Sequence, residues 1–181
     1  MNVIETAIPG VVILESRVFR DDRGYFLETF NRKALADAGI DIDWKQDNLS
    51  LSAKSVVRGL HYQIVQPQSK LIRVVKGAVF DVALDIRRSS PTFGRHVAVV
   101  MRAGDGLALF IPAGFAHGFA ALEEETTFLY KVDEYYAPQG DRTILWNDPE
   151  LGIAWPVPPA ESIVSLKDKQ GVAFRDAEVF A

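Results

Sequence analysis

The three histidines of this chain, His61, His96 and His117, are the side chains best suited to chemistry near neutral pH. A neutral imidazole can remove a proton, and three imidazoles together can bind zinc or iron. The chain has no cysteine, which excludes disulfides, thiolate metal sites and cysteine nucleophiles. His96 follows Arg95 at the start of a predicted strand, and we interpret it as a packed or surface histidine. The motifs around the other two histidines are more informative.

His117 closes a motif of glycine, proline and histidine at fixed spacing. Gly106 is followed by five residues and then by Pro112-Ala113-Gly114-Phe115-Ala116-His117. This run resembles the second sequence motif of the cupins, which are small jelly-roll barrels. Ala121 stands where the closing Asn of that motif would be. The resemblance implies a jelly-roll barrel in which His117 lines the site.

The first cupin motif, which supplies metal ligands, is altered around His61. Gln63 stands in place of its second His, and Lys70 stands in place of its carboxylate, with Gly77 at the expected distance. An ammonium group has no lone pair and repels a divalent cation at close range. The altered motif therefore argues against a metal site. The alternative, a metal-dependent cupin oxygenase or isomerase, would use His61 and His117 as ligands.

Further motifs occur in sequence order over nearly the whole chain, from about residue 10 to about residue 170. They are Arg23–Glu28, Gln46–Asn48, Arg58–Gln63, Pro67–Lys70, Ile111–Phe119, Phe128–Lys131, Tyr135–Pro138, Trp146–Pro149 and Leu166–Asp168. Together these motifs closely resemble those of the dTDP-4-dehydrorhamnose 3,5-epimerases, a branch of the cupins. Any one of them alone would be weak, but the ordered set is specific.

The resemblance implies an isomerase of dTDP-rhamnose biosynthesis that converts dTDP-4-dehydro-6-deoxy-D-glucose into dTDP-4-dehydro-L-rhamnose. The reaction inverts C3 and C5 of the sugar, and both carbons adjoin the 4-keto group. Each proton can therefore be removed if the developing enolate is stabilised. No electron is transferred overall, so no cofactor is expected. The site needs a base, an electrophile for the ketone oxygen and an acid on the opposite face of the sugar.

The resemblance assigns the catalytic roles position by position. His61 is the base, and Asp168 fixes its tautomer and stabilises the imidazolium. Lys70 places a positive charge against the ketone oxygen, and oriented charge at a developing oxyanion is often the largest catalytic contribution. Tyr130 is the acid that reprotonates the sugar from the face opposite His61.

The resemblance also implies the contacts that hold the nucleotide. Arg23 and Arg58 match phosphate-binding arginines, whose planar guanidinium groups suit bidentate contacts. Phe26 and Tyr136 match residues that stack on thymine, and Glu28, Gln46 and Asn48 match its polar contacts. His117 matches a residue that makes a contact near the ketone or the phosphates. In the family the segment Arg23–Glu28 is donated across a homodimer, so that one site uses both chains. Such an exchange also covers an otherwise exposed strand edge.

Two other hypotheses remain open beside the metal-dependent enzyme. A related epimerase would invert only C5 or only C3 and could keep the same His–Asp pair. A non-catalytic sugar-nucleotide binding module would keep the arginines and aromatic residues without exchanging any proton.

The composition limits the classes of function. With 181 residues, of which 48% are hydrophobic and 24% charged, the chain is expected to form one cupin-like epimerase domain, residues 1–181. A net charge of −4 lacks the basic character of a nucleic-acid binder. Apolar runs such as Leu107–Ile111 are too short to span a bilayer. No secretory signal is visible in Met1–Leu14, so a cytoplasmic location without membrane or nucleic-acid partners is expected.

The segments that must position these residues have the sequence pattern of β-strands. Glycines and prolines recur about every ten residues, which predicts an all-β fold, here a cupin-type jelly-roll barrel. The predicted strands are Lys70–Val75, a half-buried strand at Phe80–Ile86 with Asp81 and Asp85 opposite its apolar face, Val97–Met101, Leu107–Ile111, Phe115–Leu122 and Thr126–Val132.

Three other features are predicted around these strands. Lys76-Gly77 between the first two strands suggests a tight hairpin. The one predicted helix is Asn31–Ala38, capped by Asn31 and ended by Gly39. The Pro-rich tail Ala137–Ala181 is expected to be an irregular layer packed over the barrel.

Overall fold

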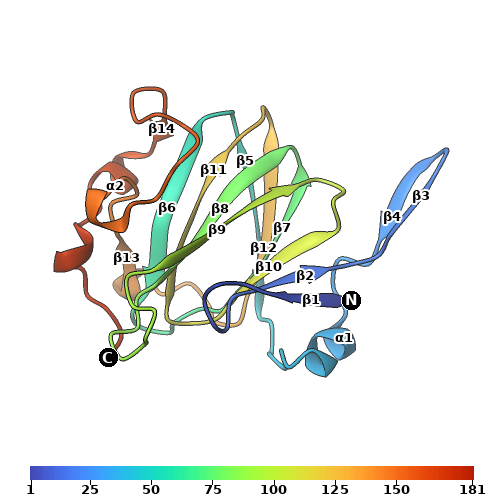
Figure 1. The fold of residues 1–181 in the computed structure, drawn as a ribbon, viewed down its shortest axis with the longest axis horizontal. Helices are drawn as coiled ribbons and strands as arrows, with labels where there is room; N and C mark the ends of the chain where they lie inside the picture. The colour runs from blue at the N-terminus through green and yellow to red at the C-terminus, as the bar shows by residue number, and fades with distance from the viewer.

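The computed structural model describes all residues, 1–181, and consists mainly of two antiparallel β-sheets that face each other (Figure 1). The first sheet has the order β1 (Asn2–Glu5), β2 (Val12–Glu15), β10 (Leu107–Ile111), β7 (Lys70–Lys76), β12 (Thr126–Val132), β5 (Gln46–Ser52). The second has the order β13 (Asp141–Thr143), β6 (Val56–Gln63), β11 (Phe115–Ala121), β8 (Ala78–Asp85), β9 (His96–Arg102), with β14 (Ile163–Val164) parallel to β6. All the predicted strands are present.

The core lies between the two sheets. Ile72, Leu109 and Phe128 of the first sheet pack with Val79 and Met101 of the second in one buried cluster. Each fully buried side chain of this kind stabilises the fold by about 1.5–3 kcal/mol. Two sheets closed over one core form the predicted all-β jelly-roll barrel.

The predicted hairpin at Gly77 is wrong. β7 pairs with β10 and β12, whereas β8 pairs with β9 and β11, so the two strands belong to different sheets. Gly77 carries the chain across the barrel corner with φ +73°, and a Cβ there would lie 2.5 Å from Thr126 Oγ1. The sequence shows a turn here, but a tight turn between two strands does not reveal whether they share a sheet.

Strand β8 is buried on both faces, which corrects the prediction of a half-buried strand. Asp81 and Asp85 are each 0% exposed. On the opposite face, Val82 and Leu84 pack against Ile144 and other residues of the C-terminal tail. The tail therefore forms the predicted irregular layer over the second sheet, where Figure 1 shows it in orange and red beside β6. Asp81 is left facing the interior of the barrel.

The predicted helix is present as α1 (Arg32–Asp37). The Asn31 side chain caps it by accepting a hydrogen bond from the Ala34 N–H, and Gly39 follows the C-cap with φ +85°. Leu35 buries the inner face of α1 against the first sheet. The other helices are short: α2 (Leu166–Lys169), and the 3-10 turns Pro138–Gly140, Pro149–Leu151 and Phe174–Asp176. None of these helices has the length and hydropathy needed to cross a membrane.

Strands β3 (Val18–Asp21) and β4 (Gly24–Leu27) form a separate hairpin that projects away from the barrel (Figure 1). Its aromatic side chains are largely in solvent in the single chain, and Phe26 is 69% exposed. A two-stranded ribbon of this kind has little stability of its own in water.

Candidate active site

A cavity of about 310 Å³ opens between the two sheets and brings together six of the side chains predicted from the sequence. These are Arg58, His61, Lys70, His117, Tyr130 and Tyr136. Strands β6 and β11 of the second sheet and β7 and β12 of the first supply five of them. The cavity is also lined by residues that the sequence did not single out for a role, namely Ser50, Tyr62, Gln63, Gln68, Gly118, Phe119, Phe128, Asp141 and Lys167.

His61 and Asp168 form the pair implied by the sequence. His61 Nε2 lies 2.5 Å from Asp168 Oδ1, and the Gly59 N–H donates to Oδ2 at 3.4 Å. Asp168 is almost completely buried on α2, where Ser165 Oγ caps the helix by accepting from the Asp168 N–H. The His61 side chain is 33% exposed and has no hydrogen bond from Nδ1 within the protein. Nδ1 is therefore the nitrogen left for a substrate.

The carboxylate of Asp168 is kept ionised. Burial alone would raise its pKa, but the hydrogen bonds from His61 and the Gly59 N–H outweigh burial and lower the pKa below its usual value. An ionised carboxylate at Nε2 holds the imidazole in one orientation and stabilises the imidazolium once His61 takes a proton.

Two glycines allow β6 and β11 to approach closely beside this pair. A Cβ at Gly59 would lie 2.6 Å from the Gly118 Cα, and Gly59 has φ +119°. The register makes His61 and His117 cross-strand partners, and it shifts directly after His117. Directly opposite residues share one face of a sheet, so both imidazoles lie on the same face as the cavity.

Lys70, the first residue of β7, is a buried cation beside His61. Its side chain is largely enclosed, and Nζ donates to the His61 carbonyl oxygen at 3.3 Å. Burial lowers the pKa of Lys70 to about 8, while the charges of Asp81 and Asp141 act in the opposite direction. At neutral pH the group is still mainly an ammonium ion, which can face a developing oxyanion.

His117 also pairs with a carboxylate, which the sequence analysis missed. Its Nε2 lies 3.0 Å from Asp81 Oδ1 and 3.1 Å from Oδ2. Burial lowers the pKa of His117 although Asp81 opposes this shift. The sequence did show that Asp81 lies on the face of its predicted strand opposite the apolar residues. We interpreted that face as solvent-exposed and therefore gave Asp81 no role.

Tyr130 and Arg58 line the cavity from β12 and β6. Burial raises the pKa of Tyr130, with Arg58 acting in the opposite direction, so the phenol is protonated at neutral pH and can donate. Arg58 Nε donates to Ser52 Oγ at 3.1 Å, and no carboxylate pairs with its guanidinium. It is available for a phosphate.

The outer part of the cavity contains an ionic cluster. The Tyr136 hydroxyl donates to Asp141 Oδ2 at 3.1 Å, and Lys167 forms an ion pair with the same oxygen. Tyr136 is 58% exposed, so one face of its ring is free to stack on a base.

Gln46 and Asn48 lie beside the cavity without lining it. Both are on β5, where Gln46 Nε2 donates to Asn48 Oδ1 at 2.7 Å. Asn48 is the direct cross-strand partner of Tyr130, so the two side chains share one face of the sheet.

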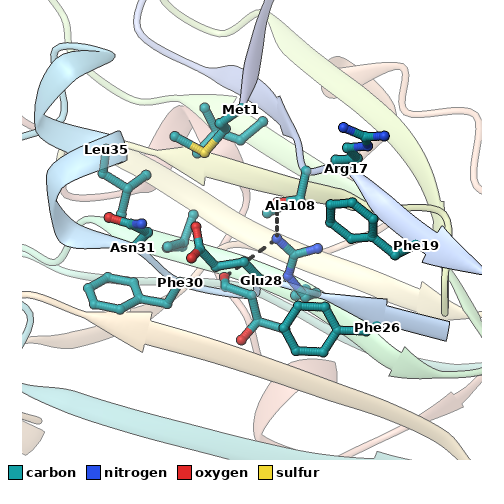
Figure 2. A pocket seen from close by; sticks show the side chains of 14 residues that line it. Met1, Arg17, Phe19, Phe26, Glu28, Phe30, Asn31, Leu35 and Ala108 are labelled. Carbon is teal, nitrogen blue, oxygen red and sulfur yellow. Dashed lines mark hydrogen bonds between the residues drawn. The ribbon is translucent and has the colours of Figure 1, made fainter.

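The other three predicted residues are not near His61 within one chain. Arg23 is at the tip of the β3–β4 hairpin and pairs with Asp21 at 2.5 Å. Phe26 and Glu28 line a different pocket of about 300 Å³, between the hairpin and α1 (Figure 2). A single chain therefore holds the residues predicted to be catalytic at one site and part of the predicted nucleotide site elsewhere.

The donor set does not favour the metal hypothesis. No three His, Asp or Glu side chains are grouped to hold an ion. His61 and His117 each bond a carboxylate through Nε2, and the Lys70 ammonium lies beside them. A dication between the two imidazoles would be repelled by that charge.

Comparison with known proteins identifies the family to which the chain is similar. A family model described as dTDP-4-dehydrorhamnose 3,5-epimerase matches residues 5–176. The dTDP-4-dehydrorhamnose 3,5-epimerase of Pseudomonas aeruginosa is 51% identical over 181 residues, which is 99% of either chain. The crystal structure of dTDP-6-deoxy-D-glucose-3,5-epimerase from Legionella pneumophila, in complex with dTDP-4-keto-L-rhamnose, has a TM-score of 0.94 and 42% identity, covering 98% of this chain and 94% of that one.

A 3'-monoepimerase from Streptomyces bikiniensis, solved in complex with dTDP-quinovose, is more distant. Its TM-score is 0.89 at 33% identity, covering 95% of this chain and 87% of that one. The similarity to the family and the cupin-type fold predicted from the sequence are both confirmed. This chain belongs to the dTDP-4-dehydrorhamnose 3,5-epimerase family.

Proposed function

We propose that the chain converts dTDP-4-dehydro-6-deoxy-D-glucose into dTDP-4-dehydro-L-rhamnose by inverting C3 and C5. The observation that carries the proposal is the His61–Asp168 pair, at 2.5 Å, on a cavity that also contains Lys70 and Tyr130. A base with its carboxylate, a buried cation and a protonated phenol are the groups that epimerisation next to a ketone requires.

Each inversion follows the same sequence of proton transfers. His61 Nδ1 removes the proton from the carbon beside the ketone, and Asp168 stabilises the imidazolium. The electron pair moves onto the ketone oxygen as an enolate, which the Lys70 ammonium stabilises. Tyr130 then donates its proton to the opposite face of the carbon. Loss of a proton from His61 to solvent, and gain of one by Tyr130, prepare the site for the second carbon.

The same site accounts for recognition of the nucleotide. Arg58 and Tyr136 both line the cavity, and we assign the diphosphate to the first and stacking on thymine to the second. These two roles, and those of Arg23, Phe26, Glu28, Gln46 and Asn48, follow from the family resemblance. With the nucleotide bound in this way, the sugar would lie in the deepest part of the cavity, where Lys70 and His117 are buried.

The decisive experiment is NMR of the thymidine-linked 4-keto sugar in D₂O with the purified protein. Deuterium uptake at both C3 and C5 is expected, because each proton leaves on His61 and is replaced from solvent. Binding of the nucleotide without any uptake would indicate the non-catalytic binding module instead. Activity that is lost with EDTA and restored by a metal would revive the metal-dependent hypothesis.

A second candidate function is an epimerase that inverts C3 alone. It is favoured by the similarity to the 3'-monoepimerase from Streptomyces bikiniensis. The His–Asp pair by itself does not decide how many carbons are inverted, because the sugar must also turn over between two proton abstractions. The same spectra separate the candidates, since a monoepimerase exchanges one position only; exchange at C5 alone would identify a C5 epimerase.

The pH dependence should reflect Lys70. The pKa of its ammonium is lowered to about 8, so the cation is present below that pH and is lost as the pH rises through it. We expect kcat/KM, which reports the free enzyme, to fall above pH 8. Lys70→Arg keeps its charge at every accessible pH and should lack this alkaline fall, even if its activity at pH 7 is lower. A wild-type profile that stays flat to pH 9.5 would contradict a catalytic ammonium.

We also propose that the chain acts as a homodimer in which the β3–β4 hairpin completes the partner's site. The hairpin projects from the barrel (Figure 1). Its aromatic side chains are exposed in the single chain. Strand β5, which carries Gln46 and Asn48 next to the cavity, is at an edge of its sheet and has two exposed leucines, Leu49 and Leu51. An apolar, unpaired edge beside a site that lacks part of its nucleotide contacts suits an incoming strand.

Subunit complementation tests this arrangement. His61→Asn and Arg23→Ala are each expected to lower activity, by loss of the base and of a phosphate contact. When the two variants are unfolded and refolded together, about a quarter of the sites should combine an intact His61 with an intact Arg23 from the partner. Recovery of no activity beyond the sum of the two variants would mean that each chain uses its own hairpin.

A further inference from the structure

The second His–Asp pair of the cavity, His117 and Asp81, has no part in the proton transfers described above. Asp81 lies on β8 and is 0% exposed, and His117 Nε2 is the only side-chain partner of its carboxylate. Both carboxylate oxygens are within 3.1 Å of that nitrogen. A carboxylate isolated in this way must direct the orientation of the ring it holds.

The pair fixes the tautomer of His117. An ionised carboxylate only accepts hydrogen bonds, so Nε2 carries the hydrogen. Nδ1 of His117 has no hydrogen bond within the protein. The fully enclosed side-chain polar atoms without a partner are Ser50 Oγ and Thr143 Oγ1, so Nδ1 is not one of them and must be accessible. Nδ1 is therefore open to the cavity that His117 lines.

The surroundings keep this imidazole neutral. The His117 side chain is 8% exposed, against 33% for His61. A proton on Nδ1 would add a second positive charge next to the buried Lys70, which itself already offsets the charge of Asp81. Burial and Lys70 both lower the pKa of His117. At neutral pH, Nδ1 therefore presents a lone pair to the cavity.

A lone pair can only receive a hydrogen bond, which limits what His117 can bind. The ketone oxygen and the phosphate oxygens are acceptors as well, so neither can pair with Nδ1. The donors of a 4-keto hexose are its ring hydroxyl groups. We propose that Asp81 is a positioning residue, which holds His117 in the Nε2–H tautomer so that Nδ1 accepts a hydrogen bond from a sugar hydroxyl.

This inference rests on the proposed function for the identity of the sugar. It differs from the contact with the ketone or the phosphates that the family resemblance implied for His117. It also gives the two imidazoles separate tasks: His61 accepts the substrate's carbon-bound proton, and His117 recognises a hydroxyl without changing its charge.

The tautomer is tested first, without any turnover. In ¹⁵N-histidine NMR spectra of the wild-type protein at pH 7, His117 should show a neutral ring with its hydrogen on Nε2; its signals are assigned by their loss in His117→Gln. A ring protonated on Nδ1, or an imidazolium, would overturn the proposal. This result does not depend on whether the protein is an epimerase.

The recognition step is tested with Asp81→Asn, whose amide can accept or donate and so no longer fixes the tautomer. We expect KM for the 4-keto sugar nucleotide to rise about 3- to 10-fold, the range for one neutral hydrogen bond. The Kd for dTDP, which has no sugar hydroxyls of the hexose, should stay unchanged. The alkaline fall in kcat/KM should also move to lower pH, because Asp81 raises the pKa of Lys70.

Asp85→Asn is the matched control. Asp85 is on the same strand and equally buried, but it bonds Arg87, Ser90 and Thr92 outside the cavity. This variant should be less stable with an unchanged KM. If Asp81→Asn weakens dTDP binding as much as it raises KM, or leaves KM unchanged, Asp81 does not position a sugar contact. Absence of turnover in the wild type would refute the proposed function and leave the tautomer result standing.

Discussion

His61→Asn is expected to lower kcat by about 10²–10⁴-fold, the usual contribution of a general base, and to stop deuterium uptake at both C3 and C5. Asn is close to His in size and polar, so the partly exposed position on β6 can accept it without a cavity. It has no nitrogen that takes up a proton near neutral pH. The measurement is single-turnover NMR in D₂O with the variant in excess over the sugar nucleotide.

The partner of His61 should show a related loss. Asp168→Asn keeps an oxygen near Nε2 but removes the charge that stabilises the imidazolium, so we expect kcat to fall at least about 10²-fold. Because the pKa of the Asp168 carboxyl is lowered in the folded protein, the charge contributes stability that is present above its unfolded pKa and is lost as the pH falls below that value. The variant should accordingly lose part of its stability at pH 7.

His96→Asn is the control for both variants. His96 lies on β9, outside the cavity, and the substitution should leave kcat and dTDP binding as in the wild type. If His61→Asn still exchanges one of the two carbons at the wild-type rate, a second base serves that carbon and the single-base mechanism is wrong.

Much of the fold could be predicted because local signals and tertiary packing agree. The helix at residues 32–37 has a capping Asn31 and a terminating Gly39, and the structure uses both. Strands such as Thr126–Val132 are bounded by the same residues in the sequence pattern and in the structure. The partner of a strand is a long-range property, and for this reason the turn at Gly77 predicted a hairpin where the chain changes sheet.

The candidate site could likewise be predicted only in part. The positions of His61, Lys70, Tyr130 and Asp168 came from motifs, and the structure brings all four together. Asp81 was missed because its alternation with apolar residues is the pattern of a solvent-facing aspartate. The C-terminal tail packs on the apolar face of β8, so the face that carries Asp81 is directed toward the interior of the barrel. A pattern of period two reports that two faces differ, but not which of them meets water.

The cavity offers positive charge although the chain has a net charge of −4, with Arg58 for the diphosphate and Lys70 for the enolate oxygen. Lys70 and Arg58 both face the cavity, and neither forms a salt bridge with a carboxylate of the protein. The acidic groups Asp81 and Asp168 are each held behind an imidazole instead. These two carboxylates therefore act on the substrate only through the two histidines.

Lys70→Met should lower kcat by about 10²–10³-fold while leaving the Kd for dTDP nearly unchanged. The ammonium is needed against the enolate oxygen, a charge that exists only in the transition state and intermediate, so its loss appears in kcat and not in ground-state binding. Met fills a similar volume in an enclosed position. Replacing a buried charge that has no salt bridge by an apolar group should also maintain or raise the melting temperature.

Lys76→Met is the matched control, because Lys76 ends the same strand, β7, in solvent, where it pairs with Glu125. It should behave as the wild type in kcat and in dTDP binding, since an exposed ion pair of this kind contributes little. Calorimetric titration with dTDP, beside kcat under saturating substrate, separates the two effects for each variant. If Lys70→Met lost affinity for dTDP in proportion to kcat, Lys70 would be a ligand of the nucleotide, and the enolate would need another source of positive charge. Arg58, the other cation in the cavity without a salt bridge, would then be the residue to substitute next.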